Sequence, residues 1–255
     1  MIRAFEDYLQ GGGYPELVGD LDPGIKRRIL QEYFDVMIYR DLVERHGTAN
    51  LAALRLLIRR LVDGVGSSMS INKIHNDLKS AGYRIGKNAL YDWLDQLETI
   101  CFVQIARKFD PSVVRQELAE RKAYVVDNGF LHAMSYRYSG NHEKLLENLI
   151  AMELRKKGLD LLFFKGDQEC DFVVVNDAGQ ARSLQVAYDL ASPDIRKREI
   201  RALVRASRAA GSTDAFLVTM DQEEDLLVDG VAIAVRPAWK LLALWDQAWA
   251  DPATP

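Results

Sequence analysis

The chain has 255 residues, of which 48% are hydrophobic and 27% are charged, and this balance suits one large globular domain or two small ones. Its formal net charge of −4 excludes a generally cationic nucleic-acid binder and leaves that role to local basic surfaces. The longest purely apolar runs are far shorter than the roughly 20 residues of a spanning helix, and charged residues follow Met1 closely. We therefore expect a cytoplasmic protein with no membrane partner.

The first long predicted helix covers residues 26–45, after a turn signal at residues 11–15. Its apolar side chains recur at a spacing of three and four residues and form one continuous face. We take residues 1–48 as an N-terminal helical segment. Its apolar face packs against the rest of the chain or against a partner.

Residues 49–135 have the pattern of a winged helix, in which three helices precede a pair of strands. The predicted helices cover residues 50–65, 71–80 and 87–99, with Ser70 as the expected N-cap of the second. The predicted strands cover residues 102–108 and 122–126. The polar segment 111–121 between the strands is the expected wing.

Residues 136–255 change to an α/β pattern with the order α-β-β-β-α-β, followed by a further strand and a closing helix. The predicted elements are a helix at 142–157, strands at 161–165, 170–175 and 183–188, a helix at 193–210, strands at 215–219 and 231–235, and a helix at 238–248. This order predicts an α/β sandwich as the second domain.

Three oxygen-bearing side chains are the candidate catalytic and metal-binding residues. If the hairpin turn is centred on Ala178, Asp171 faces Gln185, and directly opposed residues have Cβ atoms about 4.5–5.5 Å apart. Glu147 shares the inward stripe of its helix with Ile150 and Leu154. Together these residues could hold Mg²⁺, which prefers oxygen ligands.

A purely structural role for the same acids is the alternative, in which Glu147 and Asp171 make hydrogen bonds inside a tightly packed sandwich. The two cysteines are far apart in apolar surroundings, which indicates core thiols rather than a disulfide or a zinc site. His75 and His132 lack a second histidine at metal-binding spacing, so we interpret both as structural.

Several segments resemble the C-terminal half of prokaryotic AAA-type ATPases that carry domain of unknown function 4143. The resemblance extends over nearly the whole chain. The segments that carry it are Gly12–Glu16, Ser70–Leu78, Tyr124–Gly129, Leu146–Leu149, Asp171–Val174, Gln185–Leu190 and Arg198–Ile200. This resemblance implies a winged helix followed by a domain similar to restriction endonucleases. It also implies an ATPase module or another protein as a partner.

The sequence departs from that family in two ways. No phosphate-binding loop of the form G-x-x-x-x-G-K-[ST] occurs, so we expect no ATP binding on this chain. The nuclease signature of the family has Glu-x-Lys on the strand after the Asp, whereas this chain reads Gln185-Val186-Ala187. The missing lysine would activate water and offset phosphate charge, so the candidate site is incomplete. Replacements could come from Lys165, Arg196, Lys197 or Arg198.

Basic residues recur along the helix at 193–210 and form the candidate nucleic-acid-binding surface. They are Arg198, Arg201, Arg205 and Arg208. The expected recognition helix carries Lys87 but also Asp92, Asp95 and Glu98, a poor composition for lying in a DNA groove.

Two hypotheses follow. In the first, a degenerate nuclease-like domain binds DNA or RNA with little or no cleavage, or else is an active Mg²⁺-dependent nuclease with a relocated Lys or Arg. In the second, the chain is a non-catalytic docking or regulatory module.

Overall fold

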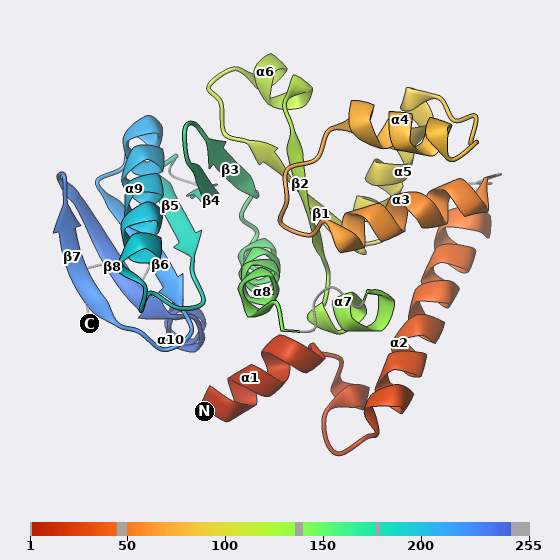
Figure 1. The fold of residues 1–255 in the computed structure, drawn as a ribbon, viewed down its shortest axis with the longest axis horizontal. Helices are drawn as coiled ribbons and strands as arrows, with labels where there is room; N and C mark the ends of the chain where they lie inside the picture. The colour runs from red at the N-terminus through yellow and green to blue at the C-terminus, as the bar shows by residue number, and fades with distance from the viewer. Residues whose placement is uncertain (1, 45–49, 136–139, 177–178, 246–255) are drawn as a thin grey trace. The chain divides into compact units, whose positions relative to one another are not determined.

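The computed structural model describes residues 2–44, 50–135, 140–176 and 179–245, and has a mixed α/β fold (Figure 1). The chain divides into two compact units. Unit 1 comprises Arg3–Ile105 and Ala119–Met152, and unit 2 comprises Ala106–Leu118 and Glu153–Pro255. The described part of the N-terminal helical segment lies in unit 1 from Arg3 onward, and each unit is described separately below.

Unit 1 begins with helix α1 (Ile2–Gly11), which the sequence reading missed, and a 3₁₀ turn at Pro15–Leu17. Helix α2 (Pro23–Met37) starts earlier than expected because Asp22 caps it, accepting hydrogen bonds from the backbone N–H groups of Gly24 and Ile25. The helix continues as a π-helix over Ile38–Glu44. The end that we expected at Arg45 lies outside the described residues.

The three helices expected next are confirmed, and so are the inward positions of the third. These elements are α3 (Leu51–Asp63), α4 (Ile71–Ser80) and α5 (Lys87–Thr99). Leu90, Trp93, Leu94 and Leu97 of α5 are buried. The side chain of Ser70 precedes α4 as expected but makes no capping hydrogen bond there. The chain continues with β1 (Val103–Lys108), β2 (Arg121–Val125), α7 (Asn128–Met134) and α8 (His142–Lys156). Unit 1 contains β2, α7, the start of β1 and α8 up to Met152.

The segment expected as a polar wing differs from the prediction. It contains a short helix, α6 (Val113–Leu118), whose side chains Val113, Val114 and Leu118 are all exposed. Asp110 initiates this turn by accepting hydrogen bonds from the Ser112 N–H and the Arg115 guanidinium. Helix α7 was missed because a seven-residue helix is too short to show a clear apolar period.

The core of unit 2 is a mixed sheet in which the strands follow the order β3-β4-β5-β6-β8-β7. The strands are β3 (Leu162–Lys165), β4 (Glu169–Val175), β5 (Ala181–Val186), β6 (Asp214–Thr219), β7 (Glu224–Val228) and β8 (Val231–Pro237). The end of β1 joins the sheet beside β3, in parallel, at Arg107 and Lys108. The expected hairpin register is confirmed, since Val173 pairs with Ser183 and Val175 with Ala181. Ala178, the expected centre of the turn, is not among the described residues.

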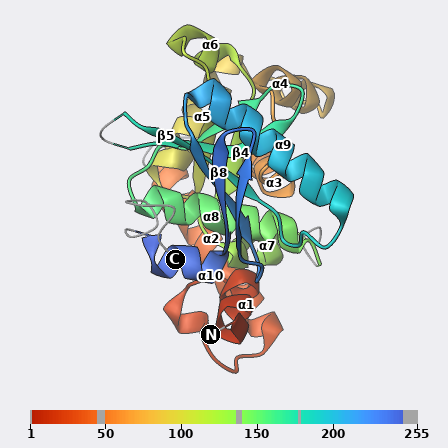
Figure 2. The same ribbon diagram turned by 90° about the vertical axis from the view of Figure 1, so that its left-hand side faces the viewer.

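Helix α9 (Pro193–Ala210) connects β5 to the parallel strand β6 and packs across β4, β5 and β6 (Figure 2). Its buried side chains Leu203 and Val204 join a hydrophobic cluster with Val173, Leu217 and Ile233 of the sheet. The sequence reading missed β7, which pairs antiparallel with β8. The last described helix, α10 (Ala238–Ala243), is shorter than predicted, and the part expected beyond residue 245 is not described.

Candidate functional site

Glu147, the first of the expected metal ligands, lies on α8 in unit 1 and is buried, with an exposed fraction of 3%. Its carboxylate accepts hydrogen bonds from Lys122 Nζ at 3.2 Å, Tyr124 Oη at 2.8 Å and Lys144 Nζ at 2.6 Å. The backbone of Gly66 packs so closely that a Cβ atom there would lie 2.8 Å from the carboxylate. Every one of these contacts is made within unit 1.

The protonation state of Glu147 follows from two opposing effects. Burial raises the pKa of the carboxyl, but the charges of Lys122 and Lys144 and the hydrogen bonds from Lys144 and Tyr124 outweigh burial and hold the pKa below its usual value. Lys122 has no exposed side-chain surface, so it needs this carboxylate as its counter-charge. The geometry supports the structural interpretation of Glu147 as part of a buried ion pair.

Asp171 and Gln185 lie together on the β4–β5 hairpin, as the register arithmetic predicted. The backbone N–H of Asp171 donates to Gln185 Oε1 at 3.1 Å, and Asp171 Oδ2 accepts from the backbone N–H of Val186 at 3.0 Å. Both side chains are buried. The two oxygens proposed as metal ligands therefore already accept hydrogen bonds from the sheet.

Glu199 on α9 is a third member of this cluster, and the sequence reading did not single it out. Gln185 Nε2 donates to Glu199 Oε2 at 2.7 Å, while Arg198 Nε donates to Glu199 Oε1 at 2.8 Å. Glu199 is only 4% exposed, and it precedes the buried Ala202 and Leu203 by three and four residues. An acid on the inner face of an otherwise basic helix was the signal that could have revealed it.

The structure thus brings together Asp171, Gln185 and Glu199, and it surrounds Glu147 with partners of its own. Among the described residues, no group of three His, Cys, Asp or Glu side chains has a spacing that could hold a metal ion. A Mg²⁺ ion at the hairpin would have to use the remaining lone pairs of Asp171 and Gln185, beside Glu199, which accepts the hydrogen bond from Gln185.

Ala187, at the position where the resemblance implies a lysine, is 2% exposed and belongs to the hydrophobic cluster beneath α9. Of the cations considered as replacements, Arg198 is bound to Glu199 and Arg196 makes a bidentate ion pair with Glu224. The hydrogen bonds that Arg196 donates to Glu224 raise the pKa of this arginine above its usual value. Lys165 lies directly opposite Glu169 in the register of β3 and β4.

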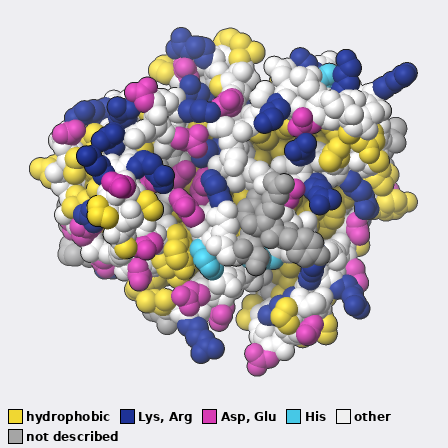
Figure 3. All heavy atoms as spheres, viewed as in Figure 1, with side chains coloured by type: hydrophobic (Ala, Val, Ile, Leu, Met, Phe, Trp, Pro, Cys, Tyr) yellow, Lys and Arg dark blue, Asp and Glu magenta, His cyan; other side chains and the backbone are white. Residues whose placement is uncertain are grey.

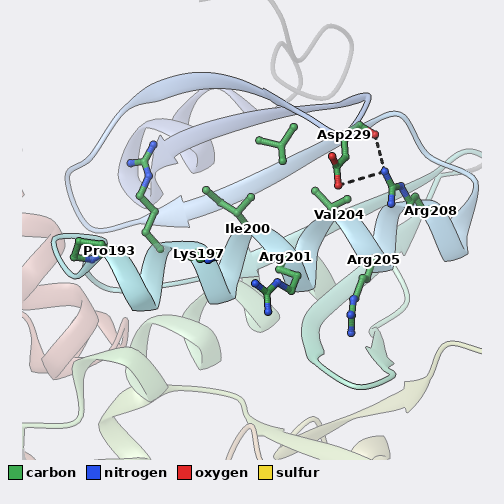
Figure 4. Close-up of a pocket in the computed structure, with 10 residues that line it drawn as sticks. Pro193, Lys197, Ile200, Arg201, Val204, Arg205, Arg208 and Asp229 are labelled. Atoms are coloured by element: carbon green, nitrogen blue, oxygen red, sulfur yellow. Dashed lines mark hydrogen bonds and ion pairs between the residues drawn. The ribbon is translucent and has the colours of Figure 1, made fainter.

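The basic side chains of α9 line a groove of about 590 Å³ beside the tip of the β7–β8 hairpin (Figure 4). Arg201, Arg205 and Arg208 line it as the basic stripe predicted, together with Arg196 and Lys197. Arg198, the remaining member of that stripe, is not among the lining residues. Figure 3 shows Lys and Arg side chains gathered over the region of α9, with hydrophobic and acidic side chains among them.

The cations of the groove differ in how firmly they are held. Arg205 pairs with the exposed Asp167 at 2.9 Å, and Arg208 donates to the carbonyl oxygen of Asp229 at 2.9 Å. Within the described parts of the chain, Lys197 and Arg201 make no ion pair or hydrogen bond through their side chains. These two exposed cations can meet a phosphate without first breaking an internal ion pair.

A family model described as a domain of unknown function (DUF8612) matches residues 2–141. A protein of Methanocaldococcus jannaschii, "Uncharacterized protein MJ1544", is 29% identical over 251 residues, which cover 94% of this chain and 55% of that protein. An "Uncharacterized protein" of Haemophilus influenzae is 28% identical over 189 residues, covering 74% of this chain and 47% of its own length. The chain thus spans about half the length of these curated relatives. No solved structure matches it.

Proposed function

The chain belongs to the family described as domain of unknown function DUF8612, and we propose that it binds nucleic acid through the groove of α9 and cleaves it slowly or not at all. The observation that carries this proposal is the basic groove itself. Five cations line it, against one acid, Asp229, which already pairs with Arg208. Such a surface attracts the phosphate backbone even though the net charge of the chain is negative.

The proposed lack of cleavage rests on the hairpin. The order α8-β3-β4-β5-α9-β6 is the one expected of a restriction-endonuclease-like domain, and it supports our proposal of that fold. The order of three helices, α3, α4 and α5, before the strands β1 and β2 supports the proposal of a winged helix in residues 49–135. Within it, Ala187 stands where the lysine is required, and the Asp171 and Gln185 oxygens are engaged with backbone N–H groups. The means of activating water and offsetting phosphate charge are therefore weakened.

The resemblance to AAA-type ATPases extends the proposal to the protein as a whole. We propose that residues 1–255 correspond to the non-ATPase portion of such a protein. On this proposal, an ATPase module is the expected partner of the chain. The matched segments cover 55% and 47% of the two relatives, which leaves room for such a module in them.

One observation favours a docking role as a second function. Helix α6 exposes Val113, Val114 and Leu118 to solvent, with exposed fractions of 70%, 68% and 84%. A short helix with three exposed apolar side chains is typical of a protein contact.

No helix among the described residues combines the length and apolar character that crossing a membrane needs.

Fluorescence anisotropy with labelled DNA and RNA, between 50 and 200 mM salt, tests the binding proposal. We expect affinity to fall steeply with salt, and to fall at least about tenfold in Arg201→Glu, because contacts to phosphate release counterions. Arg28→Glu is the matched control, since Arg28 is an exposed arginine of α2 and the change in net charge is the same. Equal loss in both variants, or binding that ignores salt, would favour the docking function instead.

A cleavage assay with Mg²⁺ or Mn²⁺ tests the second half of the proposal. We expect no products above background from the unaltered protein. Products that disappear in Asp171→Ala would show an active nuclease with a relocated cation. Products that persist in Asp171→Ala would place the chemistry away from the hairpin.

A further inference from the structure

The groove of α9 has an apolar strip between its cations. Ile200 and Val204 point from α9 toward the β7–β8 hairpin, where Val228 completes the strip (Figure 4). Ile200 and Val228 are only partly buried, packed against the cluster that contains Val204. The strip therefore still offers apolar surface to a ligand.

Cations flank the strip along one side and at its ends. Arg201 and Arg205 project from α9 away from Ile200 and Val204, whereas Arg208 turns toward Asp229 at one end of the strip (Figure 4). Lys197, Arg201 and Arg205 follow one another at intervals of four residues, which is about 6 Å of helix rise per step. A ligand that fills this groove needs an apolar part for the strip and a regular row of negative charges beside it.

We propose that this groove receives single-stranded nucleic acid, with an unstacked base on the strip of Ile200, Val204 and Val228 and successive phosphates on Lys197, Arg201 and Arg205. This inference rests on the proposed function and adds the form of nucleic acid that the site selects. In a duplex the bases stay stacked in the interior, so the phosphates would reach the cations while the strip met only solvent or sugar. A single strand can turn a base outward and satisfy both parts of the groove.

The size and chemistry of the groove agree with this ligand. A volume of about 590 Å³ lies in the range of small-molecule sites and is enough for one or two nucleotides. Arginine is suited to this arrangement because its planar guanidinium binds phosphate in a bidentate manner and also stacks on bases. If three cations contact phosphates, the logarithm of the single-strand binding constant should fall with the logarithm of salt concentration at a slope of roughly −2.

The test compares three ligands of equal length: a single-stranded 15-mer, its duplex, and a 15-mer in which every nucleoside is replaced by an abasic spacer. The abasic strand keeps the phosphates and loses the bases. We expect the normal strand to bind the protein at least about fivefold tighter than either of the others. Val228→Thr, which keeps the shape of the side chain but adds a hydroxyl, should lower affinity for the normal strand and leave the abasic strand unchanged. Ile200→Ala serves as a second variant, and thermal unfolding checks that both fold.

The outcomes separate this inference from the function beneath it. Equal binding of normal and abasic strands, or tighter binding of the duplex, would overturn the base site and leave nucleic-acid binding intact. If no oligonucleotide bound while a glutamate-rich peptide did, both proposals would fail together. If the protein preferred the normal strand over the abasic strand, and neither Val228→Thr nor Ile200→Ala reduced this preference, the assignment of the base to this strip would also be overturned.

Discussion

The side-chain amide of Gln185 donates a hydrogen bond of 2.7 Å to the carboxylate of Glu199 and so joins strand β5 to helix α9. This bond requires an amide at position 185, because a carboxylate there would face Glu199 without a proton to share. Gln185 is therefore the side chain that satisfies a buried acid, at a position where the resemblance to nucleases would place a glutamate.

Gln185→Glu should lower the free energy of unfolding at pH 7 by about 1–3 kcal/mol, because it removes the donor and opposes two buried carboxylates. Urea unfolding measures the change, and Gln185→Met separates the lost hydrogen bond from the added charge. If the new carboxylate completes a metal site, millimolar Mg²⁺ should stabilise this variant more than the unaltered protein. Equal unfolding midpoints for Gln185→Glu and the unaltered protein would contradict the assigned contact.

Glu147→Gln should cost about 3–5 kcal/mol, because it leaves Lys122 buried without its counter-charge. The same pair makes stability depend on pH. Since the folded pKa of Glu147 lies below its ordinary value of 4.5, the contribution of the pair is complete above that pH and is lost as the pH falls toward the folded pKa. The difference in stability between the two proteins, measured by urea unfolding from pH 7 to pH 3, should therefore narrow in acid. A constant difference would show that folding leaves the pKa of Glu147 unchanged, and a difference that widens in acid would show that the folded pKa is raised.

Gly12→Ala should destabilise the protein far more than Gly82→Ala. Both glycines have positive φ, 83° and 89°, so each substitution strains the backbone by about 1–2 kcal/mol. Only at Gly12 would the new Cβ meet another group, since it would lie 1.9 Å from Asp127 Oδ1, whereas nothing lies within 4 Å at Gly82. We expect an additional cost of about 1–3 kcal/mol at Gly12, visible as a lower Tm. Equal Tm values for the two variants would show that Asp127 moves aside without cost.

The sequence was most informative where one periodicity ran without interruption. The hairpin register could be predicted because strand side chains alternate and the turn is marked by Asn176 and Gly179. The inward side of α5 and the burial of Glu147 followed from helical spacing in the same way. These features depend on residues close to one another in the chain.

The partners of the buried acids could not be predicted, because they come from distant segments. Lys122 precedes Glu147 by 25 residues, and nothing in the pattern of β2 shows that its lysine points inward. Glu199 accepts its hydrogen bond from Gln185, which lies 14 residues earlier in the chain, on β5. Helix α6 and strand β7 were missed because each is five or six residues long and carries mixed polar and apolar side chains.

Strand β7 stands last in the sheet order of unit 2, so none of the described strands lies along the outer side of its backbone. An open strand edge is a template on which a second chain can add, and Leu227, 77% exposed, makes this edge attractive to one. Asp225 and Asp229 are both exposed and flank that leucine. Asp225 pairs with Arg236 and Asp229 with Arg208, so a second β7 strand alongside would have to bury or break these ion pairs. We expect resistance to edge-to-edge aggregation to depend on these two aspartates.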